Sequence, residues 1–207
     1  MRWVYGPGIT PFLYDTYEVT TAEYLTNCQY SCETRVHMSE SRSTHDQPNH
    51  PVNFISNKWG AQMYCEVQYK RLPTIAEWRV AARGFDGSLY PWGDQTPSCE
   101  YAVIDVGGDG CGTDKLMAVG SKPNGVSPYG IHDLVGNAEE MLNDQEPQYV
   151  GTDYYATAGG SFISPSSSDH LRLDEDYDLG NTKLEEVYTP SSDPDWSARF
   201  GFRCVSD

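Results

Sequence analysis

The stretch YCEVQYKRLPTIAEWRVAARG, residues 64–84, carries the clearest structural signal in this chain. Its Thr74 precedes Glu77 by three residues, which is the spacing of a capping box at the start of a helix. Ala81 and Ala82 favour a helical backbone, and the helical pattern stops at Gly84. The stretch therefore predicts a short helix between Thr74 and Gly84.

Two further short helices are indicated nearer the start of the chain. The segment TTAEY places Thr20 three residues before Glu23, which repeats the capping box. In SNKWGAQMYC, Ser56 is a candidate N-cap, and Trp59 and Met63 fall on one helix face. The helical signal is therefore confined to the first 84 residues.

The remainder of the chain favours loops. Residues 85–207 are dense in Gly, Pro, Asn, Asp and Ser and predict loops and short strands, with AGGSFI and RFGFRCV as strand-like runs. The polar stretch SESRSTHDQPNH, residues 39–50, predicts a surface loop. A loop-rich region of this length needs disulfides or bound ions to hold it in place.

Length and composition indicate a globular chain of 207 residues, which suits one domain or at most two small ones. The 14 basic and 30 acidic residues give a net charge of −16, which disfavours nucleic acid and anionic membrane surfaces as partners. An apolar run of about 18 residues is absent, so we expect no membrane span. The first residues, MRWVYGPGITPF, also lack the pattern of a secretory signal.

Six cysteines form an even set that allows 15 pairings. Their spacing lacks the CxxC pairs of a structural zinc site. Disulfides are the better interpretation, and they predict an oxidising compartment.

Seven segments, taken in order, carry a family resemblance. They are YEVTTAEY (17–24), HPVNFIS (50–56), the opening stretch (64–84), YPWGD (90–94), SPYGIHDLVGNAEEM (127–141), AGGSF (158–162) and RFGFRC (199–204). The set resembles the formylglycine-generating enzyme family, also called the sulfatase-modifying factor family, over about residues 12–204. The resemblance implies an α+β, C-type lectin-like fold with few short helices, short strands and long ordered loops. It implies one domain over residues 1–207, and we expect a trimmed N-terminal edge because the family carries a further Gly-rich strand there.

The resemblance also bears on the disulfides. It implies a bond between Cys65 and Cys204, worth at most about 4–5 kcal/mol in the chain-entropy model. The other two predicted pairs are local, Cys99 with Cys111 and Cys28 with Cys32.

The family's oxidase uses two cysteines just after its GGS motif to hold copper and to attack a substrate thiol. In GGSFISPSSSDH these positions fall at about Ser164 and Asp169. Because neither side chain forms the thiolate that Cu(I) prefers, we expect no catalytic residue for formylglycine formation and no copper. A serine nucleophile at Ser161 or Ser164 with His170 as its base is disfavoured, since GGSFI lacks the last glycine of a nucleophile elbow.

A calcium ion is the predicted cofactor. In the family a side chain, two carbonyls and a closing glutamate hold it, and the resemblance carries these roles to Asp133, Gly136, Ala138 and Glu140. Such oxygen ligands suit a hard cation. A second family site uses an asparagine where this chain has Val103, so we expect that site to be lost.

The resulting hypothesis is a non-catalytic domain that binds a protein, small-molecule or carbohydrate ligand through residues 163–197. Variable proteins of diversity-generating retroelements use this region of the same fold in that way. The candidate contact residues are Ser164, Asp169, His170, Tyr177, Tyr188 and Trp196. The alternatives are a metal-dependent oxidase acting on a small molecule or peptide, and a structural subunit of a cell-surface assembly. The predicted disulfides place the protein in the periplasm, on the cell surface or outside the cell.

Overall fold

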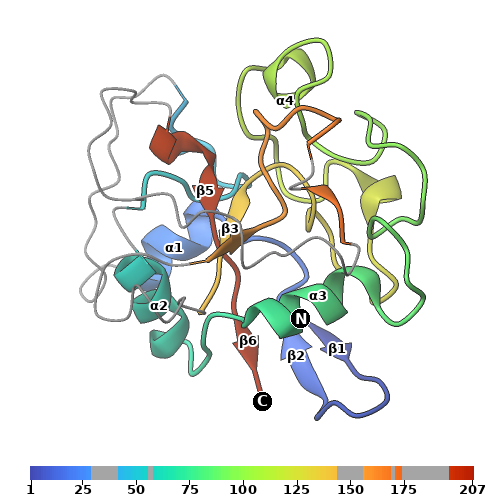
Figure 1. Ribbon diagram of the computed structural model, residues 1–207. Coiled ribbons are helices and arrows are strands. Elements are labelled where there is room, and N and C mark those ends of the chain that lie inside the picture. The colour runs from blue at the N-terminus through green and yellow to red at the C-terminus, as the bar shows by residue number, and fades with distance from the viewer. Residues whose placement is uncertain (29–41, 56–57, 144–155, 169–170, 174–195) are drawn as a thin grey trace.

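The structure is a computed structural model that describes residues 1–28, 42–55, 58–143, 156–168, 171–173 and 196–207. Its regular elements are short and are joined by long loops (Figure 1). In chain order they are β1 (Arg2–Val4), β2 (Phe12–Tyr14), α1 (Thr21–Asn27), α2 (Lys58–Val67), α3 (Ile75–Arg83), α4 (Asp109–Gly112), η1 (Pro123–Gly125), β3 (Glu139–Met141), β4 (Thr157–Ala158), η5 (Trp196–Arg199), β5 (Phe200–Gly201) and β6 (Val205–Ser206). This architecture confirms the predicted mixture of few helices, short strands and long loops.

Helices α1 and α3 begin at the two predicted capping boxes. In α1, the Thr20 amide donates to Glu23 Oε2 at 2.9 Å, and the Glu23 amide donates to Thr20 Oγ1 at 3.3 Å. The same reciprocal pair joins Thr74 and Glu77 at α3. Helix α3 ends at Gly84, whose φ of 62° suits glycine.

Helix α2 contains Trp59 and Met63, as predicted, whereas its predicted cap Ser56 lies outside the described residues. The part of the chain that the structure describes contains no helix that is long and apolar enough to cross a membrane.

The loop-rich half departs from the sequence prediction in two places. Strand β4 ends at Ala158, so the prediction of a strand over AGGSFI was wrong beyond that residue. Gly159 and Gly160 have φ values of 90° and 65°, and this left-handed backbone turns the chain out of the sheet. The single turn α4 was not predicted, because Gly110 and Cys111 form it with positive φ values of 57° and 59° instead of a helical sequence pattern.

Two three-stranded sheets meet at the last residues of the chain. One sheet has the order β1-β2-β6 and is antiparallel, with Tyr14 opposite Val205. The other has the order β4-β3-β5, in which β5 runs parallel to β3 and pairs Glu140 with Gly201. Since β5 and β6 are separated by only residues 202–204, the C-terminal segment connects the two sheets (Figure 1).

The core under α1 and α2 surrounds a disulfide and three aromatic rings. Tyr24 stacks on Tyr64 at 5.6 Å, and Phe202 meets the edge of the Tyr64 ring at 5.4 Å. The fully buried Cys65–Cys204 bond lies in the same cluster. This bond was predicted, and it fixes the end of α2 to the C-terminal segment.

The predicted surface loop is only partly a surface feature. Residues 39–41 lie outside the described ranges, and Thr44 is 1% exposed. Its hydroxyl donates to Pro51 O at 2.8 Å, and its amide donates to Asn53 Oδ1 at 3.0 Å. These hydrogen bonds explain how a polar residue is accommodated in the core.

Candidate functional site

The turn after the second glycine of AGGSF holds the residue that stands where the family resemblance places a catalytic cysteine. The Ser161 amide donates to Ser164 Oγ at 2.9 Å, and the Ser164 amide donates to Ser161 O at 2.9 Å. A Cβ on Gly160 would lie 3.0 Å from Ser164 Oγ, so the hydroxyl sits directly over the glycine. The Ser164 side chain therefore closes its own turn.

Ser161 is fully buried, and its hydroxyl has no hydrogen-bond partner among the described residues. A serine nucleophile needs a base within hydrogen-bond reach. Across the described ranges, neither Ser161 nor Ser164 has a histidine or carboxylate hydrogen-bonded to its hydroxyl. His170 and Asp169, the other candidates here, lie outside the described residues.

Sulfur is used for bonds that hold the fold together. The predicted Cys65–Cys204 and Cys99–Cys111 bridges are both present, and Cys28 is also disulfide-bonded. Its predicted partner Cys32 lies outside the described ranges. Among the described residues, no cysteine is free to supply a copper-binding thiolate.

An ion pair fixes the loop beside this turn. Arg42 pairs with both Asp109 and Asp114 and lies 5.3 Å from the centre of the Phe162 ring. The Gly110 amide donates to Phe162 O at 2.7 Å, which ties α4 to the turn. The carboxylates of Asp109 and Asp114 are thus both paired with an arginine.

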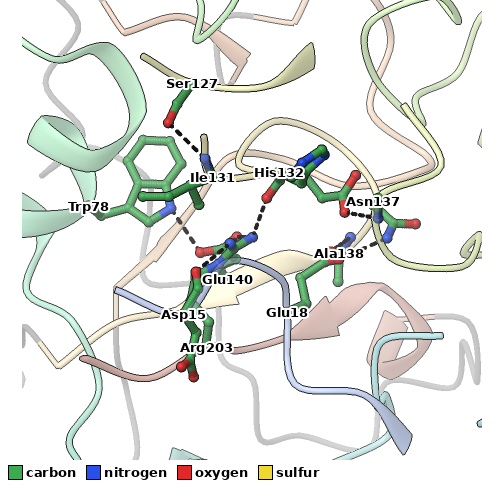
Figure 2. A network of polar contacts seen from close by, with 12 residues as sticks. Asp15, Glu18, Trp78, Ser127, Ile131, His132, Asn137, Ala138, Glu140 and Arg203 are labelled. Carbon is green, nitrogen blue, oxygen red and sulfur yellow. Dashed lines mark hydrogen bonds and ion pairs between the residues drawn. The ribbon is translucent and has the colours of Figure 1, made fainter. Parts of the chain in front are cut away.

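A buried polar network lies between the two sheets, and its centre is Arg203 (Figure 2). The guanidinium donates to Glu140 Oε1 from Nε at 2.8 Å and from Nη2 at 2.5 Å. It also donates to His132 O at 3.0 Å, and Trp78 Nε1 donates to Glu140 Oε2 at 3.0 Å. Both oxygens of Glu140 are therefore engaged.

Complete burial acts against the charge on both members of this pair. Burial lowers the pKa of Arg203, but Glu140 and the other acidic groups around it together raise that pKa above its ordinary value. Burial also raises the pKa of Glu140, and the charge and hydrogen bonds of Arg203 act in the opposite direction. A buried pair of this kind is costly to break, because removing one partner leaves the other charge without compensation.

Two more carboxyl groups extend the network. Glu18 is 1% exposed and accepts hydrogen bonds from Asn137 Nδ2 and the Ala138 amide, each at 3.0 Å. Asp133 accepts one from the Gly120 amide at 2.6 Å. Burial, followed by the charge of Asp133, raises the pKa of Glu18 well above its ordinary value, and burial also raises that of Asp133.

The predicted calcium ligands Asp133, Gly136, Ala138 and Glu140 do lie on one tightly turned loop. Asp133 and Gly136 have φ values of 56° and 76°, and a Cβ on Gly136 would fall 2.5 Å from Val103 O. Both oxygens of Glu140 accept hydrogen bonds, from Arg203 and from Trp78, so a calcium ion closed by Glu140 would compete with these contacts. Among the described residues no three His, Cys, Asp or Glu side chains are grouped to hold a metal. Calcium therefore stays a prediction that depends on Asp133 and the loop carbonyls.

Sequence reasoning missed Arg203, Trp78 and Glu18 as members of this network. The available signal was the position of Arg203 between the apolar residues Phe202 and Cys204, since a charge among buried residues requires a partner.

The geometry defines a disulfide-stabilised, loop-rich domain of few short helices and strands, and sequence comparison assigns that domain to a family. Residues 7–207 match the sulfatase-modifying factor enzyme 1-like domain, and the chain belongs to this family. It is 40% identical over 196 residues to the formylglycine-generating enzyme of Thermomonospora curvata, covering 78% of this chain and 57% of that protein. It is 33% identical over 176 residues to the "Inactive C-alpha-formylglycine-generating enzyme 2" of Bos taurus, covering 75% and 50%. The chain thus spans about half the length of the curated relatives it matches.

Solved structures show the same fold. The crystal structure of CarF has a TM-score of 0.66 at 23% identity, with 96% of this chain and 87% of CarF covered. Variable protein 1 of Treponema denticola has a TM-score of 0.63 at 16% identity, covering 100% and 91%. At these identities the similarity establishes the formylglycine-generating-enzyme-like fold.

Proposed function

We propose that this domain is a non-catalytic member of its family that binds a ligand or protein partner through residues 163–197. The observation that carries the proposal is Ser164. Its hydroxyl is held by the Ser161 amide within a closed turn, at a position where the family's oxidase needs a thiolate.

The state of the cysteines supports this proposal. The described cysteines are all in disulfides, and a hydroxyl is a poor ligand for Cu(I). The curated relative from Bos taurus that is 33% identical to this chain carries the word "inactive" in its name, so loss of the oxidase activity has a precedent in the family.

A rigid frame is the second requirement for binding through loops. Described residues within and after the proposed region are firmly held: Leu173, inside it, is 3% exposed, and Phe200, which follows it, pairs with Glu139 of β3. Tyr177 and Tyr188, the predicted aromatic contacts, lie outside the described residues, as does the side chain of Trp196. One structural neighbour is named variable protein 1, from Treponema denticola, and variable proteins are the class that the sequence analysis put forward. The disulfides further support a location in the periplasm, on the cell surface or outside the cell.

Thiol titration tests the non-catalytic half of the proposal. The native, unreduced protein should show no reactive thiol with a disulfide-exchange reagent and no stoichiometric Cu(I) binding under a competing chelator. The Ser164→Cys variant serves as a positive control for a thiol exposed at that turn. Tight copper binding by the wild-type protein would contradict this proposal and favour the alternative of a metal-dependent oxidase.

Binding is tested with a defined glycan array and a defined peptide array, probed with wild-type protein and with Tyr177→Ala and Tyr188→Ala variants. We expect a hit that the variants weaken at least about tenfold, which corresponds to 1.4 kcal/mol. Trp59→Ala, an exposed aromatic on α2, is the matched control. Hits that survive both variants would place binding elsewhere on the domain.

A further inference from the structure

An apolar groove lies between the β1–β2 connection, the end of α3 and the turn before Gly130. Its volume is about 580 Å³. The rings and prolines that line it are Tyr5, Pro7, Pro11, Phe85, Pro128 and Tyr129. Tyr5 is 62% exposed and Phe85 is 50% exposed, so the groove presents aromatic surface to solvent.

The aromatic side chains of the groove are held in place before any ligand arrives. Tyr129 Oη donates to Tyr5 O at 2.7 Å, and the two rings meet edge to face at 5.8 Å. Phe85 lies so close to Gly6 that a Cβ there would fall 1.8 Å from the ring. A preformed surface avoids part of the entropy cost of binding.

The groove is also flanked by positive charge in a strongly acidic chain. Arg79 and Arg83 line an adjoining hollow of about 220 Å³ that shares Gly84 and Phe85 with the groove. Arg2 lies beside the turn that carries Tyr129, since a Cβ on Gly130 would be 3.4 Å from Arg2 Nε. Across the described residues, neither Arg2 nor Arg79 forms an ion pair, although the whole chain has a net charge of −16. Asp86 is the one acidic residue that lines the groove or the adjoining hollow, so the arginines there outnumber the carboxylates, in contrast to the molecule as a whole.

We propose that this groove binds an extended protein segment in which proline or aliphatic residues are followed by acidic residues. Aromatic-lined grooves recognise extended, proline-containing segments. Arginine guanidinium groups pair well with carboxylates. The net charge of −16 argues against an anionic membrane as the occupant, because such a surface would repel the domain as a whole.

The groove and the loop region proposed above are built from different residues, and they meet where Arg83 Nη1 donates to Leu173 O at 2.9 Å. The turn that contains Ser164 is hydrogen-bonded to the α4 segment, and in Figure 1 α4 lies at the opposite end of the domain from the β1–β2 hairpin. All the residues named for the groove lie within the described ranges.

The test uses an array of defined 12-residue peptides in which proline content and charge vary independently, followed by fluorescence anisotropy on the strongest sequences. We expect selection of peptides that combine proline or aliphatic residues with an acidic end. The same peptides with lysine in place of the acidic residues should bind at least about tenfold more weakly.

Phe85→Ala and Arg79→Glu should each weaken the selected peptides at least about tenfold, and Arg79→Glu should also reduce the salt dependence of binding. Trp59→Ala, which removes a similarly exposed ring on another face, should leave binding unchanged. Unchanged circular dichroism and melting temperature will show that the variants fold.

Failure of the array to select this class would overturn the proposal. So would equal binding by wild type and Phe85→Ala. Sedimentation with vesicles of 30% phosphatidylserine that is lost in the same two variants would assign the groove to membranes instead. Peptides that need Tyr177 or Tyr188 and not Phe85 would support the loop region alone, so the two proposals can fail separately.

Discussion

Replacing Glu140 by glutamine should destabilise this domain more than any conservative change at its surface. The carboxylate accepts two hydrogen bonds from Arg203 and one from Trp78, and both charged residues are at most 1% exposed in their side chains. Glutamine keeps the shape but leaves the guanidinium buried without a counter-charge. Removing one partner of a buried pair costs about 3–5 kcal/mol.

Companion variants separate the contributions. Trp78→Phe removes one hydrogen bond to a charged acceptor, so we expect a loss of about 1.5–3 kcal/mol. The double variant Glu140→Leu with Arg203→Met replaces the pair by apolar groups of similar length and should recover a large part of the loss, because it leaves no buried charge unpaired.

Urea unfolding of the disulfide-intact protein, followed by tryptophan fluorescence, measures these differences as shifts in midpoint at constant slope. The reasoning fails if Glu140→Gln costs less than about 1 kcal/mol, or if the double variant is no more stable than the single one. Either result would mean that the Arg203 charge is compensated by groups other than Glu140.

Three other outcomes follow from the geometry. The folded state holds the protons of Asp133 and Glu18 more tightly than the unfolded state, so this contribution to stability is full below the unfolded-state pKa and is lost as pH rises through the folded-state pKa. The Asp133→Asn variant, measured in EDTA, should therefore show a smaller fall in melting temperature between pH 5 and 8. A fall as steep as that of the wild-type protein would contradict this. Removing the disulfide between Cys65 and Cys204, which spans 139 residues, should lower the free energy of unfolding by up to about 5 kcal/mol. This is roughly 2 kcal/mol more than for the Cys99–Cys111 disulfide, which spans 12 residues. Equal losses of stability would show that loop length does not determine how much each disulfide stabilises the domain. If the loop carrying Gly136 binds calcium, millimolar CaCl₂ should raise the melting temperature of wild type but not of Asp133→Ala, and no shift in wild type would end the calcium prediction.

Local signals in the sequence were sufficient for the helices but not for the site. A capping box depends on two side chains three residues apart, so Thr20 and Thr74 located α1 and α3 correctly. The bridge from Cys65 to Cys204 was also anticipated, through the family resemblance.

The buried network could not be foreseen in this way. Arg203 and Glu140 are 63 residues apart, and their contact depends on the parallel pairing of β3 with β5. The family resemblance assigned Glu140 to calcium, and it gave no sign that the oxygens of this residue accept hydrogen bonds from Arg203 and Trp78. The strand predicted over AGGSFI ended early because alternation of apolar residues does not reveal the left-handed backbone of Gly159 and Gly160.

The seven residues from Phe200 to Ser206 supply one strand to each sheet. They also contain Arg203, the centre of the buried network, and Cys204, which forms the long-range disulfide with Cys65. A nascent chain that has not yet released this segment has two open sheet edges and an unneutralised Glu140. The domain therefore cannot complete its fold before this segment is available, and a chain that lacks these residues should be a substrate for quality-control proteases.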